Sequence, residues 1–301
     1  MSGETTLYDE PGPQARRRSL IGGIVATLVL FALLGVVVSR LAEQDQFSTQ
    51  LWGPLLNPSD EDFAAVWRLI GLGLVATLKA AALAIVLSLV IGTMVSVGRM
   101  MLGRWSRLPL VGLIELLRGL PVVITIYYAS RVLPELGVDL SGMPGGEGLW
   151  FLVIGLTAYN CVIIAEIIRA GVAALPRGQR EAALAIGLSP GATMRLVQLP
   201  QAVRLMLPAL ISQLVVILKD TSLAAVLGIY TELLRQGNLI ALNLDNPIQV
   251  LTVVGLIFIA LNYALSRAAR YVEWRVSRAS AGSEAGAPKT VVGVGTTATG
   301  V

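Results

Sequence analysis

Long apolar runs separated by short polar segments dominate the chain. A helix needs about 20 residues to cross a hydrocarbon core about 30 Å thick, and six runs are long enough to do so. They cover about residues 20–38, 69–97, 108–133, 149–168, 205–234 and 248–265. The pattern therefore predicts an all-α integral membrane protein with six transmembrane helices.

Basic residues are concentrated in alternate polar segments, which predicts the orientation of the spans. Arg16, Arg17 and Arg18 precede the first run, whereas the acidic segments 41–66 and 134–148 contain no Lys or Arg. Because cytoplasmic loops retain Lys and Arg, we expect both termini to be cytoplasmic. A cleaved signal peptide is the alternative for the first run, but that run is long enough to span and no small-residue cleavage site follows it.

These boundaries divide the chain into four parts. A cytoplasmic segment covers 1–19, and a first helix with its external loop covers 20–66. The main membrane domain covers 67–272 and contains a polar insertion at 170–200. The segment 273–301 is rich in Gly, Ala, Ser and Thr, and we expect it to be a disordered cytoplasmic tail.

Composition excludes several classes of chemistry. The 301 residues are 55% hydrophobic and include no histidine and one cysteine, Cys161. Histidine-ligated metals and Ser-His or Cys-His catalysis are therefore excluded, and we predict no catalytic or metal site. No Gly-Lys-Ser or Gly-Lys-Thr phosphate loop occurs, because Lys289 precedes Thr290 but follows Pro288. This chain therefore has no evident nucleotide site of its own. Nucleic-acid binding has no support.

The polar insertion at 170–200 predicts a helix, a stop and a second helix on the cytoplasmic side. Ala182, Ala183 and Ile186 form one small face of the first helix, and Gly187 fits the left-handed position that ends a helix. Ser189 before Pro190 is typical of a helix start, and we expect Pro200 to end the second helix. Such an elbow can dock on another protein. The alternative is an amphipathic connector on the lipid surface.

Charged residues lie deep in two spans. Glu115 and Arg118 are three residues apart and can pair on one helix face, with Arg118 roughly 15 Å into its span. Lys219 and Asp220 lie roughly 18 Å into another, pointing in different directions. Charges at such depth face a bundle interior or a water-filled cavity.

The elbow carries a resemblance to a known family. Glu181-Ala182-Ala183 followed by Gly187 resembles the EAA loop of permease subunits of ATP-binding-cassette importers. Residues 115–121 match the E-x-x-R-G-x-P motif of the polar amino acid branch, with Leu120 where Thr is common. Further matches to that branch are Tyr159, Asn160, Glu166, Arg169, Gly171, Pro176, Gly178, Gln179, 199–202, Pro208, Ala209 and 219–223.

The resemblance covers about residues 65–272 and implies a fold and partners. It implies the type I importer permease fold in the cytoplasmic membrane of a bacterium, with 170–200 holding the coupling helix. It also implies two ATP-binding subunits that carry ATP and Mg²⁺, a second permease subunit that is identical or homologous, and an extracytoplasmic solute-binding protein. The substrate would be a polar amino acid, with glutamate or a related amino acid favoured. The residues expected to couple to the ATPase are Glu181, Ala182, Ala183, Ile186, Gly187 and Ser189.

The substrate path is expected to use polar groups in the spans. A free amino acid carries an ammonium and a carboxylate, so its site needs opposite charges or oriented polar groups. The candidates are Arg118, Asn160, Glu166, Lys219, Asp220, Thr221 and Ser222. The alternative is an ion-pair network that locks helices together. At the level of function, the alternatives are an ion-coupled secondary amino acid transporter and, with less support, a membrane-embedded enzyme.

Overall fold

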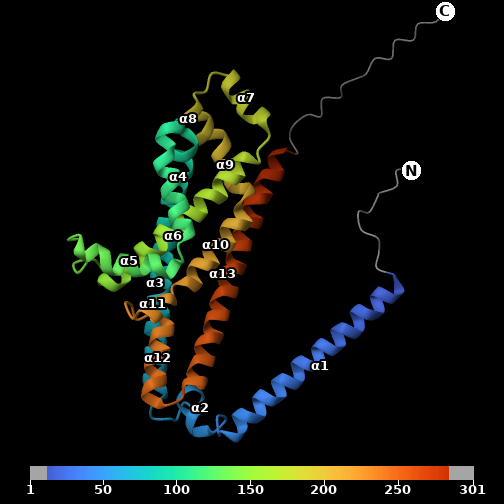
Figure 1. Ribbon diagram of the computed structural model, residues 1–301, viewed down its shortest axis with the longest axis vertical. Helices are drawn as coiled ribbons and strands as arrows, with labels where there is room; N and C mark the ends of the chain where they lie inside the picture. The colour runs from blue at the N-terminus through green and yellow to red at the C-terminus, as the bar shows by residue number, and fades with distance from the viewer. Residues whose placement is uncertain (1–11, 285–301) are drawn as a thin grey trace, which may run out of the picture.

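The computed structural model describes residues 12–284, with side chains described as far as residue 275, and this part of the chain is helical without strands (Figure 1). In chain order the elements are α1 (Pro13–Glu43), α2 (Thr49–Leu56), α3 (Phe63–Met101), α4 (Arg104–Gly119), α5 (Val122–Glu135), α6 (Glu147–Ala173), α7 (Arg177–Ala185), α8 (Pro190–Thr193), the π-helical turn η1 (Met194–Gln198), α9 (Leu199–Leu205), α10 (Leu207–Asp220), α11 (Leu223–Leu227), α12 (Leu233–Leu244) and α13 (Pro247–Glu284).

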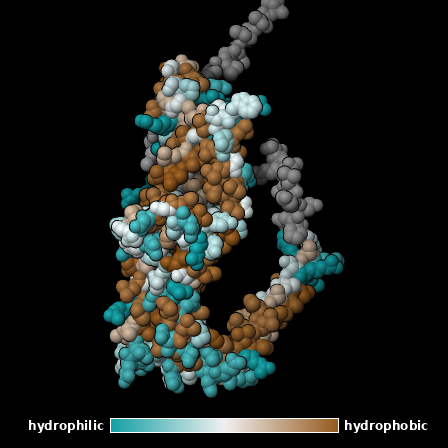
Figure 2. Space-filling model, turned by 60° about the vertical axis from the view of Figure 1, so that its left-hand side comes forward, coloured by the Kyte–Doolittle hydropathy of each residue, from teal (hydrophilic) through white to brown (hydrophobic). Residues whose placement is uncertain are grey.

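Six candidate spans emerge from these helices, which confirms the predicted architecture. Five are long and apolar enough by themselves: α1, α3, α6, α10 with α11, and α13. The sixth is the pair α4 and α5. Figure 2 shows the resulting surface, with apolar residues along the length of the bundle and polar residues gathered at its lower end. The membrane therefore covers most of the apolar exterior.

The third predicted span is not one straight helix. α4 and α5 meet at 108°, and Figure 1 shows α5 leaving the bundle crosswise. The break falls at Leu120 and Pro121. Proline has no N–H to donate and disfavours helical backbone at the residue before it, and Leu120 accordingly has the extended ψ of 140°.

The core is built on α6, which packs along α3 and α5. Small residues recur about every four positions on α3 and let the helices approach closely. At Gly92 an added Cβ would lie 2.7 Å from the Cys161 carbonyl oxygen and 2.9 Å from the Ile164 side chain. The buried small residues of α3 are Gly73, Thr77, Ala80, Ala81, Ala84, Ser88, Gly92 and Ser96.

The helix α1 buries none of its residues against the described chain and diverges from the bundle in Figure 1. Its fully exposed apolar middle, with polar ends, suits lipid contact (Figure 2). Just beyond its C-terminal end, the Gln46 carbonyl accepts a hydrogen bond of 2.6 Å from the Gln249 side chain. The loop that contains α2 is thereby fixed to the start of α13.

The last helix is longer than the sequence predicts. α13 continues to Glu284, so the expected disordered tail of 273–301 is helical over 273–284. The remainder of that predicted tail, 285–301, lies outside the described residues, as does most of the predicted cytoplasmic segment 1–19. Alanine and arginine are strong helix formers, and residues 267–280 contain many of both, so the last span continues past its apolar part.

Candidate coupling and transport sites

The elbow at 170–200 has the predicted stop and restart. α7 ends before Gly187, whose φ of 88° is the left-handed conformation that glycine adopts without strain. The Ser189 hydroxyl then accepts a hydrogen bond from the Ala192 N–H at 3.2 Å, and Pro190 occupies the first turn of α8. Both local predictions are confirmed.

The expected alanine face of α7 is divided between two sides. Ala183 is 5% exposed and faces the chain itself, whereas Ile186 is 80% exposed. Glu181 and Ala182 are also exposed, as are Gly187 and Ser189. Adjacent helical residues point about 100° apart, so Ala182 and Ala183 cannot share one narrow face. The prediction of one shared face is therefore wrong for Ala183, and its part in coupling stays a prediction.

Pro200 does not end the second helix of the elbow, contrary to the prediction. The chain stays helical through η1 and α9, with Pro200 in the first turn of α9. A proline ring clashes with the carbonyl four residues earlier in an α-helix. The wider π-helical turn immediately before Pro200 provides the room that an α-helical turn lacks.

The base of the elbow is anchored to the bundle. Val172, Met194 and Ala202 form a small buried cluster with Val97 and Met100 of α3 packed against it. At Gly171 an added Cβ would lie 3.0 Å from the Ala202 carbonyl oxygen, so α6 and α9 pass in near contact. The cluster therefore joins η1 and α9 to the ends of α3 and α6.

The helical path of the fifth span is interrupted in mid-course. α10 ends at Asp220 and α11 starts at Leu223, with Lys219 exposed and Asp220 half-buried. The Thr221 hydroxyl donates to the Leu218 carbonyl at 2.7 Å, and the Ser222 hydroxyl to the Lys219 carbonyl at 2.8 Å. Thr221 is buried, and both hydroxyls are used within the chain. Lys219 and Asp220 are therefore the two of these four residues whose polar groups are best placed to bind a ligand.

Asn160 lies away from any accessible path in this structure. It is completely buried, its amide N–H donates to the Leu156 carbonyl at 2.8 Å, and its amide oxygen accepts from Gln213 at 2.6 Å. Both ends of the amide are used inside the chain. In this structure Asn160 therefore links α6 to α10, and its contact with substrate stays a prediction.

Glu166 and Arg118 belong to separate ion pairs. Glu166 accepts from Arg99 of α3 and from Arg169 at 2.9 Å, and its side chain is mostly buried. Arg118 pairs with Glu115 at 3.0 Å, as the spacing predicts, with both side chains about half exposed. Among the described residues, no hydrogen bond or ion pair joins either group to Lys219 or Asp220.

Sequence reasoning missed the polar junction that starts α12. Glu232 is completely buried and accepts from the Leu234 and Arg235 N–H groups, each at 2.8 Å. The hydroxyl of Thr77 accepts from the Leu233 N–H at 3.0 Å. Glu is not among the residues preferred at a helix start, so Glu232 gives no clear sequence signal. The one signal in this junction is Gly228, which is left-handed at the end of α11. The half-buried Arg235 lies beside Gly228 and was likewise missed.

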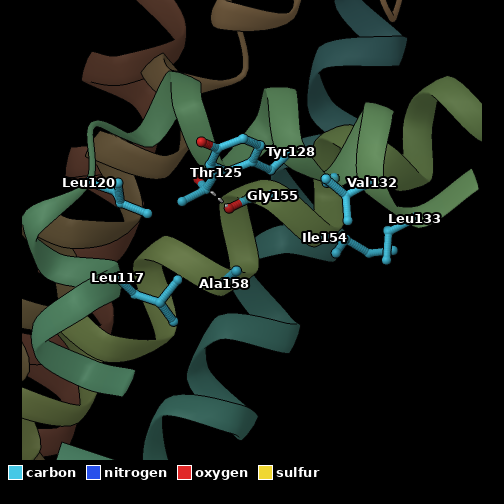
Figure 3. Close-up of a pocket in the computed structure, with 10 residues that line it drawn as sticks. Leu117, Leu120, Thr125, Tyr128, Val132, Leu133, Ile154, Gly155 and Ala158 are labelled. Atoms are coloured by element: carbon cyan, nitrogen blue, oxygen red, sulfur yellow. Dashed lines mark hydrogen bonds between the residues drawn. The ribbon is translucent and has the colours of Figure 1, made fainter. Parts of the chain in front are cut away.

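An apolar cavity of about 410 Å³ lies where α4 and α5 pack on α6 (Figure 3). Leu117, Leu120, Val132 and Ile154 are among its lining residues. The hydroxyl of Thr125 is already used, because it donates to the Gly155 carbonyl at 3.0 Å. The lining has no charged side chain for a zwitterion, so this cavity suits hydrocarbon and not an amino acid.

Relatives of the chain are membrane permeases. It is 38% identical over 235 residues to the glutamate transport system permease protein GluD of Corynebacterium glutamicum, covering 77% of this chain and 82% of that protein. It is 34% identical to the glutamine transport system permease protein GlnP of Escherichia coli, covering 71% of this chain and 97% of that protein.

Solved structures show the same fold. A crystal structure of an amino acid ABC transporter with histidines superposes with a TM-score of 0.62 at 27% identity, covering 71% of this chain and 96% of the other. A bacterial ABC transporter involved in import of the acidic polysaccharide alginate matches with a TM-score of 0.56 at 15% identity, over 86% of this chain and 99% of the other. The second likeness concerns the fold alone.

A family model described as the binding-protein-dependent transport system inner membrane component matches residues 84–278. That stretch is most of the chain, and it contains the elbow, the interrupted fifth span and the α6 core. The chain therefore belongs to the family of inner membrane components of binding-protein-dependent transport systems.

Proposed function

We propose that this chain is the permease subunit of an ATP-driven importer that moves a polar amino acid into the cell. The observation that carries the proposal is the elbow with its exposed Ile186 and left-handed Gly187, in a chain of this family. The chain is a transport component and not an enzyme. ATP and Mg²⁺ are bound by two partner ATP-binding subunits.

The elbow couples the partner to the spans. Ile186 directly follows α7 and is the most exposed large apolar side chain of the elbow, and it seats in a cleft of the ATP-binding subunit. When nucleotide binding moves the two ATP-binding subunits, α7 moves with them, and the cluster at Val172, Met194 and Ala202 passes the motion to α3 and α6. Inward-open and outward-open states then alternate through differential contacts at this docking surface.

The transported substrate is glutamate or a related amino acid. This step is supported by the relatives named as glutamate and glutamine permeases. The ammonium of Lys219 and the carboxylate of Asp220, at the break between α10 and α11, complement the two ends of a free amino acid. Arg235 supplies a further half-buried positive charge at the start of α12.

Further subunits complete the transporter. A second permease, identical or homologous, forms the other half of the path, and an extracytoplasmic solute-binding protein delivers the amino acid on the side of α2 and α12. Both termini are cytoplasmic. The distribution of arginine supports this orientation, because α3 ends and α4 starts among Arg99, Arg104 and Arg107.

The test is purification of the tagged chain with its native partners, followed by uptake in proteoliposomes that contain ATP. We expect an ATP-binding subunit to co-purify and uptake to require ATP. Gly187→Val places a β-branched residue at positive φ, which costs about 1–2 kcal/mol, and we expect it to abolish coupling. Gly187→Asn is the matched control, since Asn tolerates this conformation. A chain that purifies alone and transports under an ion gradient without ATP would establish secondary transport instead.

A further inference from the structure

Three arginines line a pocket at the cytoplasmic ends of α3, α4 and α6. Arg99, Arg107 and Arg169 come from these three helices in turn, and the pocket has a volume of about 460 Å³. The rest of its lining is apolar and consists of Met100, Leu108, Val111, Val172 and Ala173. A concentration of guanidinium groups beside hydrocarbon is the arrangement that an anionic amphiphile requires.

Positive charge in the pocket is only partly balanced. Glu166 serves both Arg99 and Arg169, the latter at 2.9 Å. No hydrogen bond or ion pair of the described residues involves the exposed side chain of Arg107. The nearby carboxylate of Glu115 is paired with Arg118 at 3.0 Å. The three arginines therefore share one carboxylate, and two positive charges remain for a ligand.

The residues around the pocket are typical of a membrane interface. Trp105 is two residues before Arg107 and is 79% exposed, and tryptophan side chains prefer the membrane interface. Arg99 is two residues from the end of α3. Leu108 and Val111 follow Arg107 along α4 toward the membrane interior, so the apolar lining continues from the charged mouth in the direction of acyl chains.

We propose that this pocket binds the phosphate headgroup of an anionic phospholipid of the inner leaflet. Guanidinium forks match phosphate oxygens, and basic pockets between helices on the cytoplasmic side suit such headgroups. Arg107 and Arg169 contact the phosphate, and Leu108 and Val111 contact the upper acyl chain. A free amino acid suits the pocket poorly, because its ammonium needs a carboxylate and Glu166 is already engaged by two arginines.

The experiment uses the intact transporter purified in mild detergent, with lipid binding measured by native mass spectrometry. Phosphatidylglycerol and phosphatidylcholine of equal chain length are titrated separately. We expect a preference for phosphatidylglycerol that Arg107→Gln weakens about fivefold, the effect of one basic residue near a charged surface. Arg270→Gln on α13 is the control, because it removes the same charge at the cytoplasmic end of another span, outside the pocket lining. We expect it to leave the preference unchanged.

Several outcomes would overturn the proposal. Equal weakening by Arg107→Gln and Arg270→Gln would mean diffuse attraction to the cytoplasmic face and no defined site. Displacement of phosphatidylglycerol by millimolar glutamate or glutamine would assign the pocket to the amino acid path. If Arg107→Gln does not yield folded protein, the wild-type titration still decides, because an absent preference for phosphatidylglycerol rejects the site.

Discussion

Gln213 of α10 donates a hydrogen bond of 2.6 Å to the amide oxygen of Asn160 in the middle of α6. The bond joins two candidate spans through groups that have few other partners in an apolar interior, and Asn160 is completely buried. A polar residue deep in a span suggests a substrate contact from sequence alone. In this structure it links the central helix to the helix that ends at Asp220.

Loss of that link is expected to lower stability and leave substrate affinity unchanged. Gln213→Ala leaves the Asn160 oxygen without its donor, which costs about 1–2 kcal/mol, since interhelical bonds in membranes contribute less than the full penalty of an unpaired buried group. Thermal unfolding of the purified transporter measures the loss. Ser212→Ala, at the exposed neighbouring residue, serves as the control. A raised half-saturation concentration with unchanged stability would contradict the structural role.

Adjacent alanines of the elbow are expected to respond differently to enlargement. Ala183→Leu overfills a site that is 5% exposed and should destabilise the fold by about 1–3 kcal/mol. Ala182→Leu adds the same volume at an exposed position and should leave the unfolding temperature unchanged. Equal effects of the two substitutions in a thermal unfolding assay would refute the division of α7 into an inner and an outer side.

Ile186→Asp is expected to separate the transporter without unfolding the permease. The side chain is 80% exposed, so a charge there disturbs no contact within the chain. Burial of a full isoleucine against a partner contributes about 1.5–3 kcal/mol, so we expect recovery of the ATP-binding subunit to fall at least tenfold. The measurement is the ratio of the two subunits after affinity purification. An unchanged ratio would remove Ile186 from the docking surface.

Two glycines of α3 form a matched pair for packing. Gly92→Ala places a methyl group against the Cys161 carbonyl and the Ile164 side chain, and we expect a loss of about 1–3 kcal/mol in unfolding free energy. Gly71→Ala, where an added Cβ meets nothing within 4 Å, should be neutral or gain up to about 1 kcal/mol from helix propensity. Chemical denaturation in detergent compares them. The packing of α3 on α6 would need revision if Gly92→Ala were equally well tolerated.

Asp220→Asn tests the proposed substrate contact. Because the amide keeps the shape of the carboxylate and removes its charge, we expect the half-saturation concentration for uptake to rise about tenfold with near-normal folded yield. Ser222→Ala is the comparison, since that hydroxyl already donates to the Lys219 carbonyl. A fall in folded yield with an unchanged half-saturation concentration would instead assign Asp220 to the support of the helix break.

Local features of the fold could be predicted from sequence because their causes are local. A continuous apolar run is enough to predict a span, and the six runs correspond to the six candidate spans. Gly187 and Ser189 act within a few residues of themselves, so their conformations follow from residue type and neighbours. The coupling elbow could be recognised for the same reason. Which of its two alanines is buried could not be predicted.

Features that depend on distant partners could not be predicted in this way. Asn160 and Gln213 are 53 positions apart in the sequence, and Arg99 and Glu166 are 67 positions apart. No local pattern specifies such pairs. Proline gives a second example, because Pro121 breaks a span whereas Pro200 lies within continuous helical structure. The difference lies in the π-helical turn before Pro200, which residue type alone does not reveal.

The π-helical turn at Met194–Gln198 also sets the rotation between the two halves of the elbow. A π-helical turn contains one residue more than an α-helical turn, so the segment behaves as an α-helix with a single inserted residue. Deleting one residue from it would turn the Ser189 end by about 100° relative to the Ala202 end. The direction in which Ile186 points thus depends on the number of residues in this turn as well as on the conformation of Gly187.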